Sequence, residues 1–152
     1  MTATVLAPAA SALDDRPLPV KARLAAAWAS LMFFYIYVDY LHLYKPGALE
    51  EILAGRVHTF EANQVFATTS LALVGIPALM VTLAAVLPAR VGRVLNLVIA
   101  ALYVPVTVFN LSGGEWLAFY GLGVAVETVL LGYVLRTAWT WPRSAAVGVP
   151  AP

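Results

Sequence analysis

Three ionisable side chains lie within long apolar stretches of the sequence, where charge is costly and often functional. Asp39 and His42 are three residues apart, so on a helix they share one face and could share a proton. Glu127 lies twelve residues beyond Glu115, which places it about 18 Å deeper along a helix, near the middle of a membrane. The low dielectric at that depth favours the neutral acid. Asp39, Glu127 and His42 are therefore the candidate catalytic residues, with a purely structural role for each carboxyl group as the alternative.

Polar and aromatic side chains gather in the half of the apolar stretches that we expect to face outward. Polar groups in lipid must find partners or line a cavity. We therefore expect a polar intramembrane pocket that opens outward and has Glu127 near its floor. The candidate ligand-binding residues are Tyr35, Tyr37, Tyr103, Thr107, Asn110, Trp116 and Tyr120, and the candidate rim residues are His58, Glu61 and Glu115.

The rim residues also have structural interpretations. Glu115 follows Ser112 by three residues, which is the spacing of a capping box at a helix start. Glu61 precedes the second apolar stretch, where a carboxylate interacts favourably with the helix dipole. His58 and Glu61 alone are too few for a metal site, and the chain has no cysteine. We therefore expect no metal and no cofactor.

Four apolar stretches must position these residues. The chain has 152 residues, of which 62% are hydrophobic and 11% charged, whereas a soluble domain carries about 25% charged residues. Crossing a membrane takes about 20 apolar helical residues, and we expect spans at about 24–44, 64–87, 94–111 and 116–135. The short second and third connections favour antiparallel neighbours, so we predict an all-α, up-down bundle of four transmembrane helices over residues 21–141. Residues 1–20 and 142–152 are expected to be flexible tails.

One face of the second stretch carries small and hydroxyl-bearing residues, a pattern that membrane helices use for packing. These residues are Gln64, Thr68, Gly75, Ala78 and Thr82. We therefore expect this face to lie against a neighbouring helix.

The distribution of basic residues predicts the orientation. Seven of the nine lysine and arginine residues lie on the side of the two termini, and only Lys45 and Arg56 lie on the other side. Because short cytoplasmic loops carry an excess of such residues, both termini should be cytoplasmic. The richness in alanine, valine and leucine favours a bacterial inner (plasma) membrane. A net charge of +1 gives no basic surface for nucleic acid, so membrane lipid is the expected partner.

Three stretches together resemble an uncharacterised family of small four-helix bacterial integral membrane proteins. They are residues 34–40, the loop 45–55, and Pro77 with Met80 followed by Arg93 and Asn96. The similarity spans about residues 20–142. The resemblance implies the four-span fold and indicates neither a reaction nor a ligand.

Three functions fit these residues. The first is an acid–base enzyme, of isomerase or cyclase type, that acts on a lipophilic small molecule: Glu127 would donate a proton, and Asp39 with His42 would accept one. The second is a small proton-coupled exporter that works as a homodimer. The third is a binding or accessory subunit without chemistry. The outward skew of the polar residues weighs against the exporter, because alternating access favours a site at the midplane.

The charge asymmetry can be tested with reporter fusions. Reporters fused at the C-terminus should be active in the cytoplasm, and reporters inserted within residues 48–57 should be active outside. The opposite pattern of activity would contradict the predicted topology.

Overall fold

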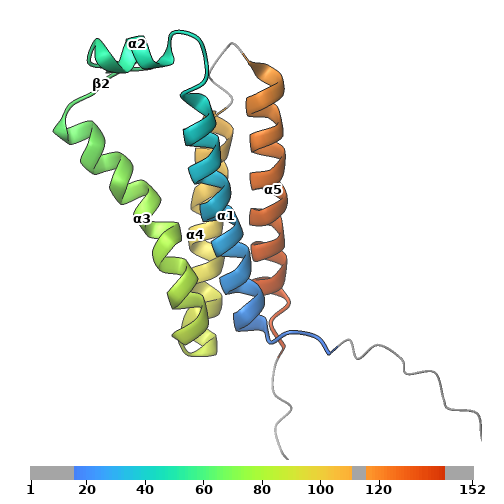
Figure 1. Ribbon diagram of the computed structural model, residues 1–152. Helices are drawn as coiled ribbons and strands as arrows, with labels where there is room; N and C mark the ends of the chain where they lie inside the picture. The colour runs from blue at the N-terminus through green and yellow to red at the C-terminus, as the bar shows by residue number, and fades with distance from the viewer. Residues whose placement is uncertain (1–15, 111–115, 143–152) are drawn as a thin grey trace, which may run out of the picture.

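Four long helices form an up-down bundle in the computed structural model, which describes residues 16–110 and 116–142 (Figure 1). They are α1 (Val20–His42), α3 (Gln64–Val86), α4 (Ala89–Phe109) and α5 (Leu117–Trp139). Each is long and apolar enough to cross a membrane, with a mean hydropathy between 1.4 and 2.1. The predicted all-α four-helix fold is confirmed, and the chain is a multi-pass membrane protein. Tails were expected at 1–20 and 142–152; of these, residues 1–15 and 143–152 lie outside the described residues, as does the turn at 111–115.

Local sequence signals set the ends of these helices. The Asn63 side chain accepts a hydrogen bond from the Phe66 backbone N–H at 3.0 Å and so caps the start of α3. The residue before Pro88 is driven out of the helical conformation, which ends α3. α4 begins directly after Pro88, at Ala89, and α5 continues to Trp139, so both helices extend beyond the expected spans.

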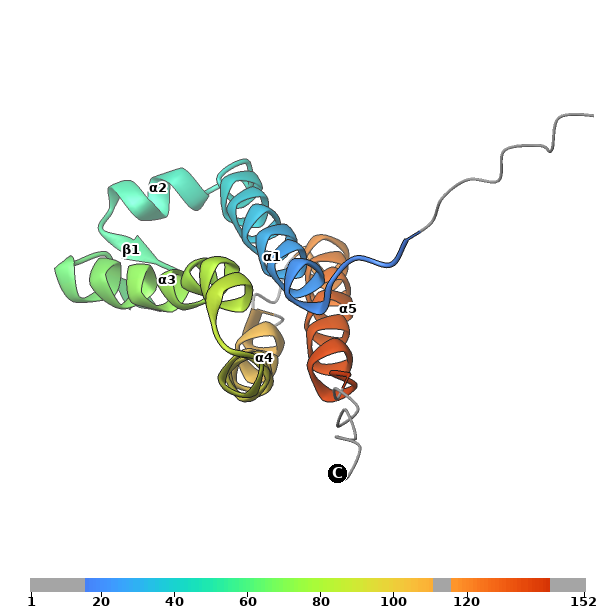
Figure 2. The same ribbon diagram turned by 90° about the horizontal axis from the view of Figure 1, so that it is seen from below.

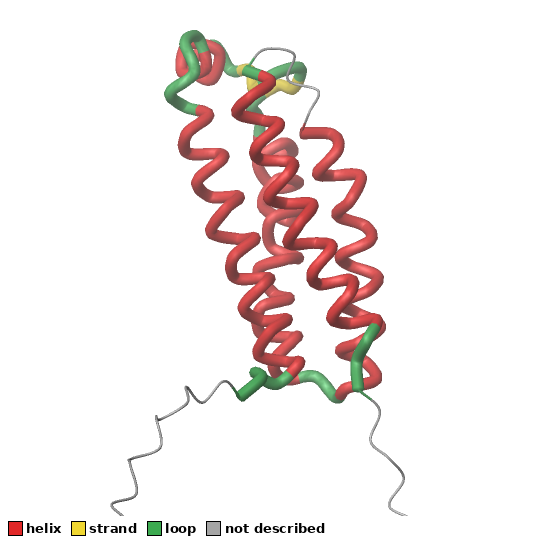
Figure 3. The backbone as a smooth tube through the Cα atoms, turned by 90° about the vertical axis from the view of Figure 1, so that its right-hand side faces the viewer, coloured by secondary structure: helices red, strands yellow, loops and turns green. Residues whose placement is uncertain are grey.

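The connection between α1 and α3 is folded. It contains a short helix, α2 (Ala48–Leu53), and two paired strands, β1 (Arg56–Val57) and β2 (Phe60–Glu61), which run antiparallel. Gly47 and Gly55 flank α2 with φ of 87° and 79°, a conformation that glycine adopts without steric cost. We name this end of the bundle the α2 end, and the opposite end, where α1 begins and α5 finishes, the terminal end (Figure 3).

The helices are not evenly packed. α1 lies between α3 and α5, and α4 packs along α5. α3 and α4 follow each other in the chain but touch little, because α3 leans away from the other helices toward the α2 end (Figures 1 and 2). The bundle is therefore closed at the terminal end and opens toward the α2 end.

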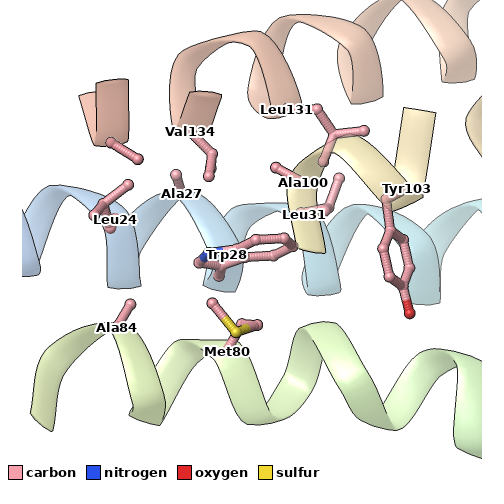
Figure 4. Close-up of a cluster of buried hydrophobic side chains, with 11 residues drawn as sticks. Leu24, Ala27, Trp28, Leu31, Met80, Ala84, Ala100, Tyr103, Leu131 and Val134 are labelled. Atoms are coloured by element: carbon pink, nitrogen blue, oxygen red, sulfur yellow. The ribbon is translucent and has the colours of Figure 1, made fainter. Parts of the chain in front are cut away.

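The closed end holds the hydrophobic core, to which all four long helices contribute (Figure 4). Its buried residues include Leu24, Ala27, Trp28 and Leu31 of α1, Met80 and Ala84 of α3, Ala100 of α4, and Leu131, Val134 and Ala138 of α5. The alanines allow the helix backbones to approach closely, as small residues do in membrane bundles.

The face of α3 that packs against α1 differs from the expected one. Pro77, Met80 and Ala84 are buried, whereas Thr68 and Thr82 of the expected stripe are exposed. α3 has the highest mean hydropathy of the four helices. Because this helix is apolar on all sides, its sequence does not mark the packed face.

A buried hydrogen-bond chain links α1 to α4 inside this core. The Trp28 indole Nε1 donates to Asn96 Oδ1 at 2.7 Å, and Asn96 Nδ2 donates to the Gly92 carbonyl at 2.7 Å. Both Trp28 and Asn96 have no exposed surface. The polar groups of both side chains are thus satisfied where lipid and water cannot reach them.

Asn96→Leu should lower the free energy of unfolding by about 1–3 kcal/mol, because it leaves the Trp28 indole N–H buried without an acceptor. The change can be measured by thermal unfolding of the purified protein in detergent. Val98→Leu, on the lipid-facing side of α4, is the matched control and should change the stability little. Equal stability of the two variants would contradict the role of this bond.

Candidate functional site

A polar cavity of about 340 Å³ opens at the α2 end, between α1, α5 and the folded connection. It is lined by Tyr35, Val38, Asp39 and His42 of α1, Phe109 and Asn110 at the end of α4, Tyr120 and Glu127 of α5, and Lys45–Ala48, Glu51, Val57 and His58 of the connection. We refer to it as the polar cavity. It brings together residues from all three groups expected from the sequence: catalytic, ligand-binding and rim.

Glu127 is the most deeply buried charged group of the polar cavity. Its side chain is 1% exposed, and Asn110 Nδ2 donates to its Oε2 at 3.4 Å. Gly123 lies one turn earlier on the same face of α5, with a methyl group of Val38 3.9 Å from the position of an added Cβ. The small Gly123 therefore lets α1 pass close to α5, which places Asp39 and Glu127 near enough to interact electrostatically.

His42 pairs across the bundle. Its Nδ1 lies 2.7 Å from the Tyr120 hydroxyl of α5. Asp39, expected to share a proton with His42, makes no hydrogen bond within the described residues and interacts with His42 only through its charge. In the described residues His42 therefore bonds to Tyr120 of α5 and not to Asp39, although the i, i+3 spacing on α1 would allow the expected pair.

Two buried hydroxyl groups lie close to Glu127 without a hydrogen bond of normal geometry. Tyr35 Oη and Thr107 Oγ1 are buried and make no hydrogen bond of normal geometry in the described structure. Thr107 is 2% exposed and lies beside both Glu127 and Tyr35. Of the two residues, only Tyr35 lines the polar cavity, where its hydroxyl can bond to water or to a ligand. Thr107, expected to bind a ligand, lines neither cavity of the described structure and lies behind the wall.

Several residues expected in the pocket lie elsewhere. Tyr37 is 60% exposed on the outer face of α1, since two residues along a helix turn a side chain by about 200° from Tyr35. Trp116 precedes α5 in a left-handed conformation and packs edge-on against Phe119. Glu61 lines a second cavity between α3 and α4. Glu115 lies outside the described residues.

Tyr103 also lies outside the polar cavity, and its hydroxyl donates to the backbone carbonyl of Leu73 in α3. Pro77 explains this bond. A proline has no backbone N–H, so the carbonyl four residues earlier, that of Leu73, loses its helical partner. Tyr103 replaces that partner from α4, which gives the tyrosine a structural role.

The folded connection contributes residues that were not expected in the site from the sequence. Pro46, Gly47 and Glu51 line the polar cavity. The Pro-Gly motif of the resemblance was the signal available for them. Among the described residues, no group of three His, Asp or Glu side chains could hold a metal ion.

A family described as "Family of unknown function (DUF6326)" matches residues 19–147 of the chain. The chain belongs to this family. Membership confirms the expected assignment to an uncharacterised family, and the matched range covers all four long helices. No curated protein and no solved structure matches the chain. The function of this DUF6326 member is therefore inferred from the geometry of the polar cavity.

The structural role of Tyr103 predicts a coupling between two positions. Tyr103→Phe should lower the stability by about 1 kcal/mol, because the Leu73 carbonyl is left without a donor. In a Pro77→Ala background the new backbone N–H restores the helical bond, so the same Tyr103→Phe change should have a smaller effect. Thermal unfolding of the two single variants and the double variant measures the coupling. Additive effects would remove the proposed link between Tyr103 and Pro77.

Proposed function

We propose that this DUF6326 protein is a multi-pass protein of a bacterial inner membrane that performs acid–base chemistry on a lipophilic small molecule in its polar cavity. An isomerase or cyclase reaction without a cofactor fits best. The single observation that carries the proposal is the placement of two carboxyl groups, Asp39 and Glu127, in one cavity at different depths. Environments that differ in this way suit one carboxyl group as an acid and the other as a base.

The roles follow from burial. Glu127, enclosed and held by Asn110, donates a proton to a double bond or ring of the substrate. Asp39, which is exposed to the cavity, accepts a proton from a neighbouring carbon. The product has the same composition as the substrate. Transfer of a proton from Asp39 back to Glu127 through the cavity resets the site, and the bond between His42 and Tyr120 holds the wall beside Asp39.

The orientation adds to the proposal. The distribution of basic residues predicts that the α2 end lies on the side of the membrane away from the cytoplasm, so the polar cavity would open to that side. Below Glu127 the bundle is filled by the hydrophobic core. Most of the lining of the polar cavity lies at the α2 end. This position favours an enzyme or a binding protein over an exporter, because alternating access uses a site near the midplane of the membrane.

Exchange of hydrogen with heavy water tests this proposal whatever the identity of the substrate. The purified protein is incubated in deuterated buffer with a lipid extract of the membranes in which it is expressed. Proton donation from Glu127 to carbon should place deuterium in one lipid-soluble species, detected by mass spectrometry. Glu127→Gln keeps the shape and hydrogen-bonding capacity but cannot release a proton, so the labelling should fall by about two orders of magnitude or more.

Glu50→Gln is the matched control, because Glu50 is exposed on α2 and does not line the polar cavity. It should label the same species as the natural chain. Undiminished labelling by a folded Glu127→Gln variant would remove Glu127 from the reaction. If the natural chain places no deuterium in any lipid-soluble species, the enzyme proposal is contradicted. Substrate-dependent proton uptake into vesicles would then indicate an exporter.

A further inference from the structure

A second and larger cavity lies beside the polar cavity. It has a volume of about 680 Å³ and lies between the α2-end halves of α3 and α4, beneath the β1–β2 hairpin. Val65, Phe66 and Leu73 of α3 and Val106 and Phe109 of α4 give it a mostly apolar wall. We name it the α3–α4 groove. It exists because α3 leans away from α4 toward the α2 end.

The ends of the α3–α4 groove are defined by structure. At the α2 end, the ring of Phe60 in β2 stacks on Phe66 at a centroid distance of 5.9 Å. At the deep end, the bond from Tyr103 to the Leu73 carbonyl ties α4 to α3. Between Gln64 and Leu73 the helix rises by about 14 Å. The groove is therefore an apolar slot along the membrane normal, of a length that suits part of a hydrocarbon chain.

The two cavities share a wall. Phe109 and Asn110 line both of them. The Asn110 side chain donates to Glu127 at 3.4 Å, so the junction lies directly beside the buried carboxyl group. A single molecule can therefore place an apolar chain in the α3–α4 groove and a polar head beside Glu127.

The polar end defines the head group. Its lining holds the carboxyl groups of Asp39, Glu51 and Glu127. Carboxylate oxygens accept hydrogen bonds, whereas the hydroxyl of Tyr35, also in the lining, can both donate and accept. A small head that donates hydrogen bonds, such as a hydroxyl or an amine, complements them. A carboxylate head would add a fourth carboxyl group to a lining that has three such groups and one lysine, Lys45.

We infer that the α3–α4 groove and the polar cavity form one two-part site for a long-chain amphiphile with a small hydrogen-bond-donating head. The inference rests on the proposed function and names the class of its substrate. The amphiphile reaches the site sideways from the lipid, between α3 and α4, and its head is delivered to Glu127 past Asn110. Its chain stays in the groove during reaction, which fixes the distance between the head and the two carboxyl groups.

Cysteine labelling tests the site by binding alone. Because the chain has no cysteine, Ser70→Cys introduces a unique thiol into the α3–α4 groove at little change in size. Leu71→Cys is the matched control, because Leu71 is the next residue of α3, is 73% exposed and lines neither cavity. Both full-length variants are placed in lipid nanodiscs, and the rate of modification by a maleimide is measured. Size-exclusion profiles and thermal unfolding show that each variant is folded.

The probes are dodecan-1-ol, dodecylamine, dodecanoate, dodecane and hexan-1-ol. At ten times its Kd a probe leaves only about a tenth of the sites free, so the alcohol and the amine of long chain should slow Ser70→Cys modification about tenfold. Modification of Leu71→Cys should not change. Dodecane, dodecanoate and hexan-1-ol should protect much less, since each lacks the correct head or the chain length.

Each other pattern overturns the inference. Equal protection of Ser70→Cys and Leu71→Cys means non-specific partition into lipid. Equal protection by dodecane means that the head is not recognised. If, without any probe, modification of Ser70→Cys becomes slower as the ratio of protein to lipid rises, a second copy of the chain covers the α3–α4 groove. The two experiments distinguish the two proposals. Deuterium labelling that depends on Glu127, without protection of Ser70→Cys, contradicts the amphiphile site and leaves the enzyme proposal standing. Protection of Ser70→Cys without deuterium labelling contradicts the enzyme proposal and leaves the amphiphile site standing.

Discussion

The need to satisfy polar groups inside an apolar solvent shapes this bundle. Lipid offers no hydrogen bonds, so every buried donor and acceptor must find its partner in the protein. Asn96 serves the Trp28 indole, and Tyr103 serves the carbonyl that Pro77 leaves free. Arg93 donates to the carbonyls of Ala138 and Trp139 at 3.2 Å and so satisfies the end of α5. Each of these bonds joins two helices, so the requirement for hydrogen bonds also fixes the packing.

Three buried side-chain atoms of the described residues are exceptions to this pattern: Arg23 Nε in the first turn of α1, and the hydroxyls of Tyr35 and Thr107. The two hydroxyls lie where the bundle changes from a filled core to an open cavity. The filled half gives the open half a rigid base, and the lean of α3 supplies the space. The proposed site therefore lies where the packing of the bundle loosens and polar groups next to Glu127 are left without a hydrogen bond of normal geometry.

The sequence predicted much of this arrangement. Hydropathy and length identified the four helices, because a membrane span needs a long apolar run. Helical spacing placed Tyr35, Asp39, Tyr120 and Glu127 on inward faces, and the structure brings them into one cavity. Depth along the helix made Glu127 the most buried candidate carboxyl group, and it is the most enclosed of those that the structure describes.

Other features depend on contacts between segments, which spacing along one helix does not contain. The partner of His42 is set by the approach of α5, and the role of Tyr103 is set by a proline on another helix. The packed face of α3 was missed because that helix has no polar side to contrast with it. The fold of the connection was missed because its helix and strands are too short to give a periodic signal.

The hydrogen bonds of α4 also bear on how the chain is made. Asn96 takes its partner from Trp28, which is 68 positions earlier, whereas Arg93 takes its partners from the last turn of α5, about 45 positions later. α4 touches its immediate predecessor α3 very little. A ribosome delivers helices in order, so α4 enters the bilayer before the helix that it packs against has been synthesised. The packing of α4 along α5, which closes the bundle, can therefore form only after α5 has been synthesised.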